Sequence, residues 1–208
     1  MQNESENSFL YSQGITEFLT IAAEYCLFIE KTPSLSTFDL LDKSRKILSL
    51  LYLKGSLLPK PDYELNEEIE TFVTEEDWYL IHDAIQKKLG ILDEYYDTQK
   101  SDKTGKIEIV SMSISEDITD VYQDIKNFVS LMNMGTEDIM KDALGECQSN
   151  FNEYWGQKAI NAIKAIHTIL LNPDILDSEN DEDNSDEEER DTSDWFITKR
   201  QSDLNKMD

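Results

Sequence analysis

The stretch TEDIMKDALGECQSNFNEYWGQKAINAIKAIHTILL, residues 136–171, decides the fold class of this chain. Its apolar residues recur with a mean step of about 3.6 residues, the period of a straight α-helix rather than of a coiled coil. The residues in this series are Met140, Leu144, Cys147, Phe151, Trp155, Ala159, Ala162, Ile166 and Ile169. We therefore predict a core helix whose second half, made more apolar by Ile160, Ile163 and Leu170, is a central element.

A helix over this whole stretch would be about 54 Å long at 1.5 Å per residue. A compact body of this size is only roughly 40 Å across, so we expect the helix to bend. Helices bend where glycine weakens them or where a polar pair caps a new start. The two places that fit are Gly145 and the pair Asn150 and Glu153.

Four further segments have helical spacing of their apolar residues. Ser36 and Thr74 are suited to cap helices at their start, and Gly135 is suited to end one. The link at 98–112 is polar and rich in turn residues, and a short strand at 107–110 would have no visible partner. We therefore predict an all-α fold, a single domain of about five main helices. These helices cover residues 9–30, 36–53, 74–89, 113–134 and 136–171.

Acidic residues dominate the chain, which has 208 residues and a formal net charge of −25. Residues 174–194 alone contain twelve acidic residues and a single arginine. Such a chain is repelled by nucleic acid and by anionic membrane surfaces, and it attracts basic proteins. We predict a helical domain at 1–172, a disordered acidic linker at 173–194 and a short peptide at 195–208. The expected partner is a basic protein, and the oligomeric state stays open.

The C-terminal peptide contains a cluster of large apolar residues, Trp195, Phe196 and Ile197, followed by Lys199 and Arg200. Such a short amphipathic segment can dock in a groove, either on its own domain or on a partner. The alternative is a frayed end with no role. These five residues are the candidate partner-binding residues.

Two observations bear on the compartment. The polar N-terminus lacks the pattern of a secretion signal, and no apolar run approaches the length of a membrane span, so we expect a cytoplasmic protein. Cys26 and Cys147 each lie on an apolar helical stripe without other cysteines nearby, which predicts reduced core residues.

Several segments resemble a bacterial family that is catalogued only as a domain of unknown function. They are SEDITDVYQDIK at 115–126, YWGQKAINAIKAIH at 154–167, WYLIHDAIQKKLG at 78–90 and EYYD at 94–97. The similarity covers about residues 8–171. It implies a bacterial, cytosolic protein and brings no activity, substrate or catalytic residue with it.

Three aspartates, Asp117, Asp120 and Asp124, lie along one edge of the helix predicted at 113–134, next to its apolar stripe. Convergent carboxylates at helical spacing are typical of sites for Mg²⁺ and similar cations. The alternative is that the early acids complement the helix dipole and the others are solvated.

A second group lies on the long helix. His167 is on its apolar side, and Glu146 and Glu153 lie further back along the neighbouring line. A neutral histidine near carboxylates can be a metal ligand or a general base. More often such a histidine is a core residue with one hydrogen bond.

The pairs Glu67-x-x-Glu70 and Glu94-x-x-Asp97 resemble the magnesium-binding signature of all-helical nucleoside triphosphate pyrophosphatases. In that family paired acids on neighbouring helices hold the metal against the phosphates. Chance is the rival explanation, because 44 of the 208 residues are Asp or Glu.

The sequence thus favours a non-catalytic protein-interaction or regulatory module without a cofactor. The alternative is a Mg²⁺-dependent hydrolase of phosphoesters or nucleotides that uses helix-borne carboxylates.

Overall fold

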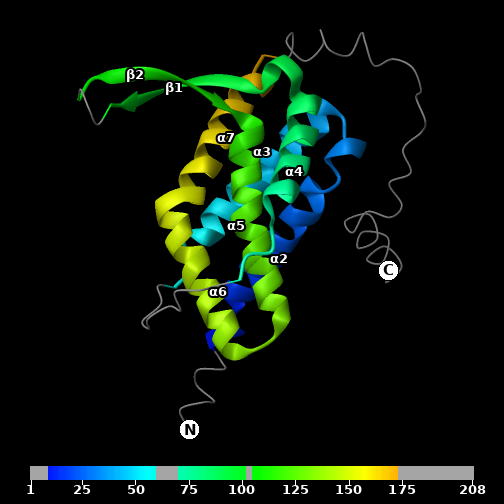
Figure 1. Cartoon of the computed structure of the whole chain (residues 1–208), viewed down its shortest axis with the longest axis vertical. Helices are drawn as coiled ribbons and strands as arrows, with labels where there is room; N and C mark the ends of the chain where they lie inside the picture. Colours follow the sequence, from blue (N-terminus) through cyan, green and yellow to red (C-terminus); the bar gives the residue numbers. More distant parts are fainter. Residues whose placement is uncertain (1–8, 60–69, 102–104, 173–208) are drawn as a thin grey trace, which may run out of the picture. The chain divides into compact units, whose positions relative to one another are not determined.

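The computed structural model describes residues 9–59, 70–101 and 105–172, and all that follows concerns these residues (Figure 1). The predicted linker at 173–194 and the peptide with Trp195, Phe196 and Ile197 lie outside the described residues. Lys199 and Arg200 lie outside them as well, so the division into domain, linker and peptide stays a prediction.

The described chain is mainly helical, which confirms the predicted fold class. The helices are α2 (Gln13–Ile29), α3 (Thr37–Gly55), α4 (Glu75–Leu89), α5 (Ile114–Met134), α6 (Glu137–Asn150) and α7 (Gly156–Leu170). A π-helical segment, Phe151–Trp155, joins α6 to α7 without a break, so α6 and α7 together form the predicted long helix. Counted in this way, the described residues contain five main helices.

Local side-chain contacts fix the ends of these helices. The Ser36 hydroxyl accepts a hydrogen bond from the Asp39 N–H at the start of α3, and Ser113 does the same for Glu116 at the start of α5. Thr74 and Asp77 form a reciprocal capping box at the start of α4. Because these contacts span three residues, the sequence alone was enough to predict them.

The long helix changes geometry at Phe151–Trp155, next to the second of the two predicted bend positions. Gly145, the first position, lies buried inside α6. A π turn places one extra residue in the helical ring. Here it brings Trp155 fully into the core, where its indole N–H donates to the Cys147 carbonyl at 2.9 Å.

The helix at the centre of the domain is α5. It packs against α2, α4, α6 and α7, and Figure 1 shows it running between them. The second half of the long helix is also a central element, as predicted, because α7 packs against α3 and α5 with Ala159, Ala162 and Ile166 fully buried, although Ile160 is exposed. Core contacts of α5 include the Phe18–Phe128 ring pair and a hydrogen bond from the Tyr25 hydroxyl to the Ile118 carbonyl.

Residues 94–113 correct the prediction made for the link at 98–112. They form a β-hairpin of β1 (Glu94–Lys100) and β2 (Ile107–Ser113), paired antiparallel with Tyr96 opposite Ser111. The interpretation of 98–112 as a link with at most one unpaired strand was wrong. The hairpin projects from one end of the helical bundle (Figure 1). Its register places Tyr96, Ile107 and Ile109 on one face, and all three are exposed. Because most of the ribbon stays in water, its sequence lacks the clear apolar alternation of a half-buried strand.

Cys26 and Cys147 are free and buried, as predicted. Among the residues with described structure, no helix is both long and apolar enough to span a membrane.

Candidate functional site

The three aspartates of α5 lie on the predicted edge, but they are not solvated. Asp117 is 1% exposed and Asp120 is 6% exposed, and Asp124 is half-buried. The interpretation of these acids as solvated surface charges was therefore wrong. Because a buried carboxylate is costly unless it is paired, their partners decide what this cluster can do.

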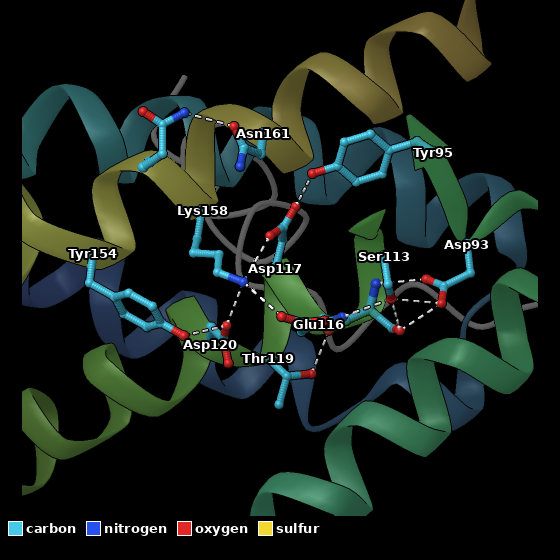
Figure 2. A network of polar contacts seen from close by, with 12 residues as sticks. Asp93, Tyr95, Ser113, Glu116, Asp117, Thr119, Asp120, Tyr154, Lys158 and Asn161 are labelled. Carbon is cyan, nitrogen blue, oxygen red and sulfur yellow. Dashed lines mark hydrogen bonds and ion pairs between the residues drawn. The ribbon is translucent and has the colours of Figure 1, made fainter. Parts of the chain in front are cut away.

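The main partner is Lys158 of α7. Its ammonium lies 2.8 Å from Asp120 Oδ2, 2.9 Å from Glu116 Oε1 and 3.4 Å from Asp117 Oδ1 (Figure 2). The Lys158 side chain is only 14% exposed. We name these four residues, Glu116, Asp117, Asp120 and Lys158, the lysine–carboxylate cluster. It joins α5 to α7 through the Lys158 ammonium.

Aromatic side chains from three other elements complete the hydrogen bonding. The Tyr95 hydroxyl of β1 donates to Asp117 Oδ2 at 2.5 Å, and the Tyr154 hydroxyl donates to Asp120 Oδ2 at 2.6 Å. The Trp78 indole of α4 donates to Asp120 Oδ1 at 3.1 Å. Among the described residues, Asp117 Oδ1 is one of the buried side-chain atoms without a hydrogen-bond partner, since its contact with Lys158 is a longer ion pair.

These contacts shift the ionisation of the cluster. Burial raises the pKa of Asp117 to about 6, against the opposing effects of the Tyr95 hydroxyl and the Lys158 ammonium. Burial disfavours the charged form of Lys158, but the neighbouring Asp120 and Glu116 outweigh it and raise the Lys158 pKa. Lys158 therefore stays an ammonium ion at neutral pH and is not available as a nucleophile or a base.

Asp93 supports the cluster from the base of the hairpin. Its carboxylate accepts hydrogen bonds from the Ser113 hydroxyl, the Ser115 hydroxyl and the Ser115 N–H, at 2.7–2.8 Å. These bonds attach the hairpin to the first turn of α5, next to the Tyr95–Asp117 contact (Figure 2). The orientation of the hairpin is thus set by buried polar contacts.

The other metal candidates have separate contacts. Asp124 accepts from the Asn150 amide, and Glu153 accepts from the Ser149 hydroxyl. His167 is exposed and its Nδ1 lies 3.0 Å from Arg45 Nη1, so the prediction of a core histidine was wrong. Glu146 is half-buried, and burial raises its pKa. Within the described ranges, no group of three or more His, Cys, Asp or Glu side chains is placed to hold a metal ion.

The pyrophosphatase-like pairs do not lie on neighbouring helices. Glu94 and Asp97 are on β1, where residues three apart point to opposite faces. Glu94 accepts from the Ser111 hydroxyl, and Asp97 pairs with Lys164 at 2.9 Å. Glu70 is exposed, and Glu67 lies outside the described residues. The structure therefore contradicts the helical geometry that this signature requires.

An open groove of about 430 Å³ lies beside the cluster, between the hairpin and α7. Its lining includes Met112 and Ser113 from β2, Glu116 and Asp117 from α5, and Lys158. The groove gives a ligand access to the side of the lysine–carboxylate cluster that faces the hairpin.

Sequence reasoning missed Lys158, Tyr95, Trp78, Asp93 and Tyr154, the last of which is 46% exposed. One signal was present. Lys158 lies in the most apolar part of the long helix, between Trp155 and Ala159, where a charged residue needs a buried partner. Asp93 and Tyr95 showed no such signal, because the hairpin that carries them was not predicted.

Comparison with protein-family models identifies the chain. Residues 9–172 match the model of the domain of unknown function DUF5063. The chain belongs to this family. The match confirms the resemblance noted from the sequence, and it covers the DUF5063 domain from the start of the described residues to the end of α7.

The crystal structure of protein BF1032 from Bacteroides fragilis is similar to this DUF5063 chain. The two are 37% identical, with a TM-score of 0.68, over 77% of this chain and 94% of that one. No curated protein matches this chain. The comparisons therefore support the fold and the DUF5063 family, and they assign no activity.

The pH dependence of stability offers a test of the buried acids. Burial raises the pKa of Asp124 to about 6, although the Asn150 amide opposes the shift. A carboxyl group with a raised pKa in the folded state stabilises the fold at low pH, and that contribution is lost as the pH rises through the folded pKa. The free energy of unfolding should therefore increase by about 1 kcal/mol per such group between pH 7 and pH 5.

Urea denaturation of Asp124→Asn at pH 7, 6 and 5 measures this contribution. The asparagine can still accept from Asn150, but it does not titrate, so the variant should lack the increase that Asp124 contributes. Asp138→Asn, at an exposed position of α6, is the control for the loss of one negative charge. An Asp124→Asn protein with the pH slope of the wild type would contradict the prediction.

Proposed function

We propose that this protein is a non-catalytic interaction or regulatory module that binds a basic partner protein. One observation carries the proposal: the carboxylates that a metal-dependent hydrolase would need are already bound by Lys158. Its ammonium lies within 3.4 Å of Glu116, Asp117 and Asp120. A divalent cation would have to displace an ammonium that is held by three carboxylates.

The charge of the chain supports the choice of partner. A protein with a formal net charge of −25 steers basic partners toward its surface and repels other anionic macromolecules. Exposed large side chains such as Tyr96, Ile107 and Ile109 on the hairpin supply apolar contact area next to this charge. Such a combination of steering charge and apolar contact is typical of protein-binding surfaces.

Calorimetric titration with Mg²⁺ and Mn²⁺, with and without nucleotide, separates this function from the hydrolase alternative. We expect no tight metal binding and no nucleotide turnover. Partner capture from native cytosol should yield a basic protein whose affinity falls by roughly tenfold or more between low and high salt, because charge steering is screened. Tight Mg²⁺ binding that Asp120→Ala abolishes would instead establish the hydrolase.

A further inference from the structure

The groove beside the lysine–carboxylate cluster follows the edge of a strand. Four consecutive residues of β2, Val110 to Ser113, line it. Gln99 of β1, which shares a face of the hairpin with Val110 and Met112, lines the groove too, so the groove extends from the edge of β2 to the face that these residues share. The opposite wall is the helix, with Tyr154, Gln157 and Asn161.

The edge of β2 that faces away from β1 has no strand partner. In the part of the chain that the structure describes, the sheet consists of β1 and β2 alone. An antiparallel ladder uses one side of each strand, so alternate N–H and C=O groups of β2 point away from β1. An open edge of this kind can pair with an extended peptide, and a neighbouring helix then provides side-chain contacts.

Asp117 lines the groove, and its Oδ1 contacts the Lys158 ammonium in an ion pair of 3.4 Å. Its Oδ1 makes no hydrogen bond within the described chain, although the residue is only 1% exposed. A buried acceptor without a donor is costly, and such atoms in native structures call for an explanation. Because Asp117 and Lys158 both line the groove, a donor bound there would share this buried oxygen with Lys158.

The charges around the groove favour a cationic donor. Glu116 and Glu153 are exposed lining residues, Asp117 is a buried lining residue, and Asp120 contacts Lys158 from outside the lining. Lys158 balances only part of this charge, because it is one ammonium among four carboxylates. A guanidinium suits the site better than an ammonium, since its planar N–H groups can donate to two acceptors at once.

We propose that this groove binds an extended, arginine-containing segment of the partner protein, which pairs with the free edge of β2 and donates a hydrogen bond to Asp117. The inference rests on the proposed function and adds to it the binding site and the chemistry of the bound segment. The backbone of the segment supplies strand pairing, and its arginine supplies the recognition of charge.

A display library of random ten-residue peptides, selected against the full-length protein, tests the proposed binding of an arginine-containing segment. Arginine-containing sequences with alternating β-branched or aromatic residues should be enriched. Replacing the arginine of the best peptide by glutamine should weaken binding by roughly tenfold, the usual loss for one charge-assisted hydrogen bond. Arginine amide alone, which cannot pair with β2, should bind at least as weakly as that glutamine peptide.

Matched variants of the protein locate the site. The Glu153 side chain is exposed and makes one 3.3 Å contact with Ser149. Glu153→Gln should therefore weaken the binding of the selected peptide without affecting folding. Asp117→Asn should weaken peptide binding further. Glu146→Gln on α6, outside the groove lining, should leave the affinity for the peptide unchanged. In spectra of ¹⁵N-labelled protein, the peptide should shift the amide signals of Val110 to Ser113.

The proposal is overturned if the library yields no enriched peptides or if the enriched peptides lack arginine. It is also overturned if the selected peptide binds Glu153→Gln and Asp117→Asn with the affinity it has for the wild type. A captured partner that binds Glu153→Gln and Asp117→Asn as well as the wild type would also overturn it, while the proposed function would remain. Metal-dependent nucleotide hydrolysis would overturn the proposed function itself.

Discussion

Replacing Lys158 by methionine is expected to lower the free energy of unfolding by about 3 kcal/mol at pH 7, because removing one member of a buried ion pair leaves the others uncompensated. Methionine retains most of the length and the apolar stem of the side chain. The loss would therefore report the unpaired charges of Asp117 and Asp120, which are 1% and 6% exposed, rather than a cavity. Urea denaturation at 25 °C measures it.

The same helix offers a matched control. Lys164 lies six residues further along α7, and its side chain is 57% exposed while paired with Asp97. Because exposed ion pairs contribute little, Lys164→Met should cost less than about 1 kcal/mol. An equal effect of the two substitutions would show that the lysine–carboxylate cluster has no special role in stability.

Two further measurements separate charge from packing in the Lys158→Met protein. Adding Asp120→Asn should recover part of the lost stability, because it removes one unpaired charge while keeping the acceptor for the Trp78 indole. The cost of Lys158→Met should also shrink at pH 5. Asp117, with its pKa raised to about 6, is then largely protonated and needs no cation.

Replacing Gly156 by alanine is expected to destabilise the fold by at least about 3 kcal/mol or to prevent folding, the upper range of overpacking effects. The π turn directs the Gly156 N–H to the Phe151 carbonyl, and a Cβ at Gly156 would overlap that carbonyl oxygen. It would also meet the Phe151 ring at 3.1 Å. A backbone oxygen cannot move aside as a flexible side chain can, so the π turn would have to open.

Gly14 of α2 is the control for this substitution, because a Cβ there meets no atom within 4 Å. Gly14 lies in the first turn of α2, where glycine costs less than in a helix interior, so Gly14→Ala should stabilise the protein by at most about 0.5–1 kcal/mol. Circular dichroism melting curves of both variants give the comparison. The prediction fails if Gly156→Ala melts at or above the wild-type temperature.

The fold class and most helix ends could be predicted from the sequence. The signals are local: a helical period in the apolar residues, capping side chains such as Ser36 and Thr74 within three residues of their acceptors, and a left-handed glycine at Gly135. The hairpin could not be predicted, because a largely exposed ribbon does not require the apolar alternation by which a half-buried strand is recognised in a sequence.

The candidate site shows a similar division. The alignment of Asp117, Asp120 and Asp124 on one edge of α5 follows from helix geometry, so the sequence located it. The role of these aspartates depends on partners from other elements. Asp120 receives its hydrogen bonds from Trp78 and Tyr154, which are 42 and 34 residues away in the chain.

The sequence by itself therefore determined the helices, their ends and the edge of α5 that carries the acids, because these depend on contacts within one or two helical turns. Only the tertiary structure decided that this edge is buried, that its cation is the protein's own Lys158, and that β2 lies open beside it. Those facts depend on how distant elements pack, and burial sets the energetic importance of a charge.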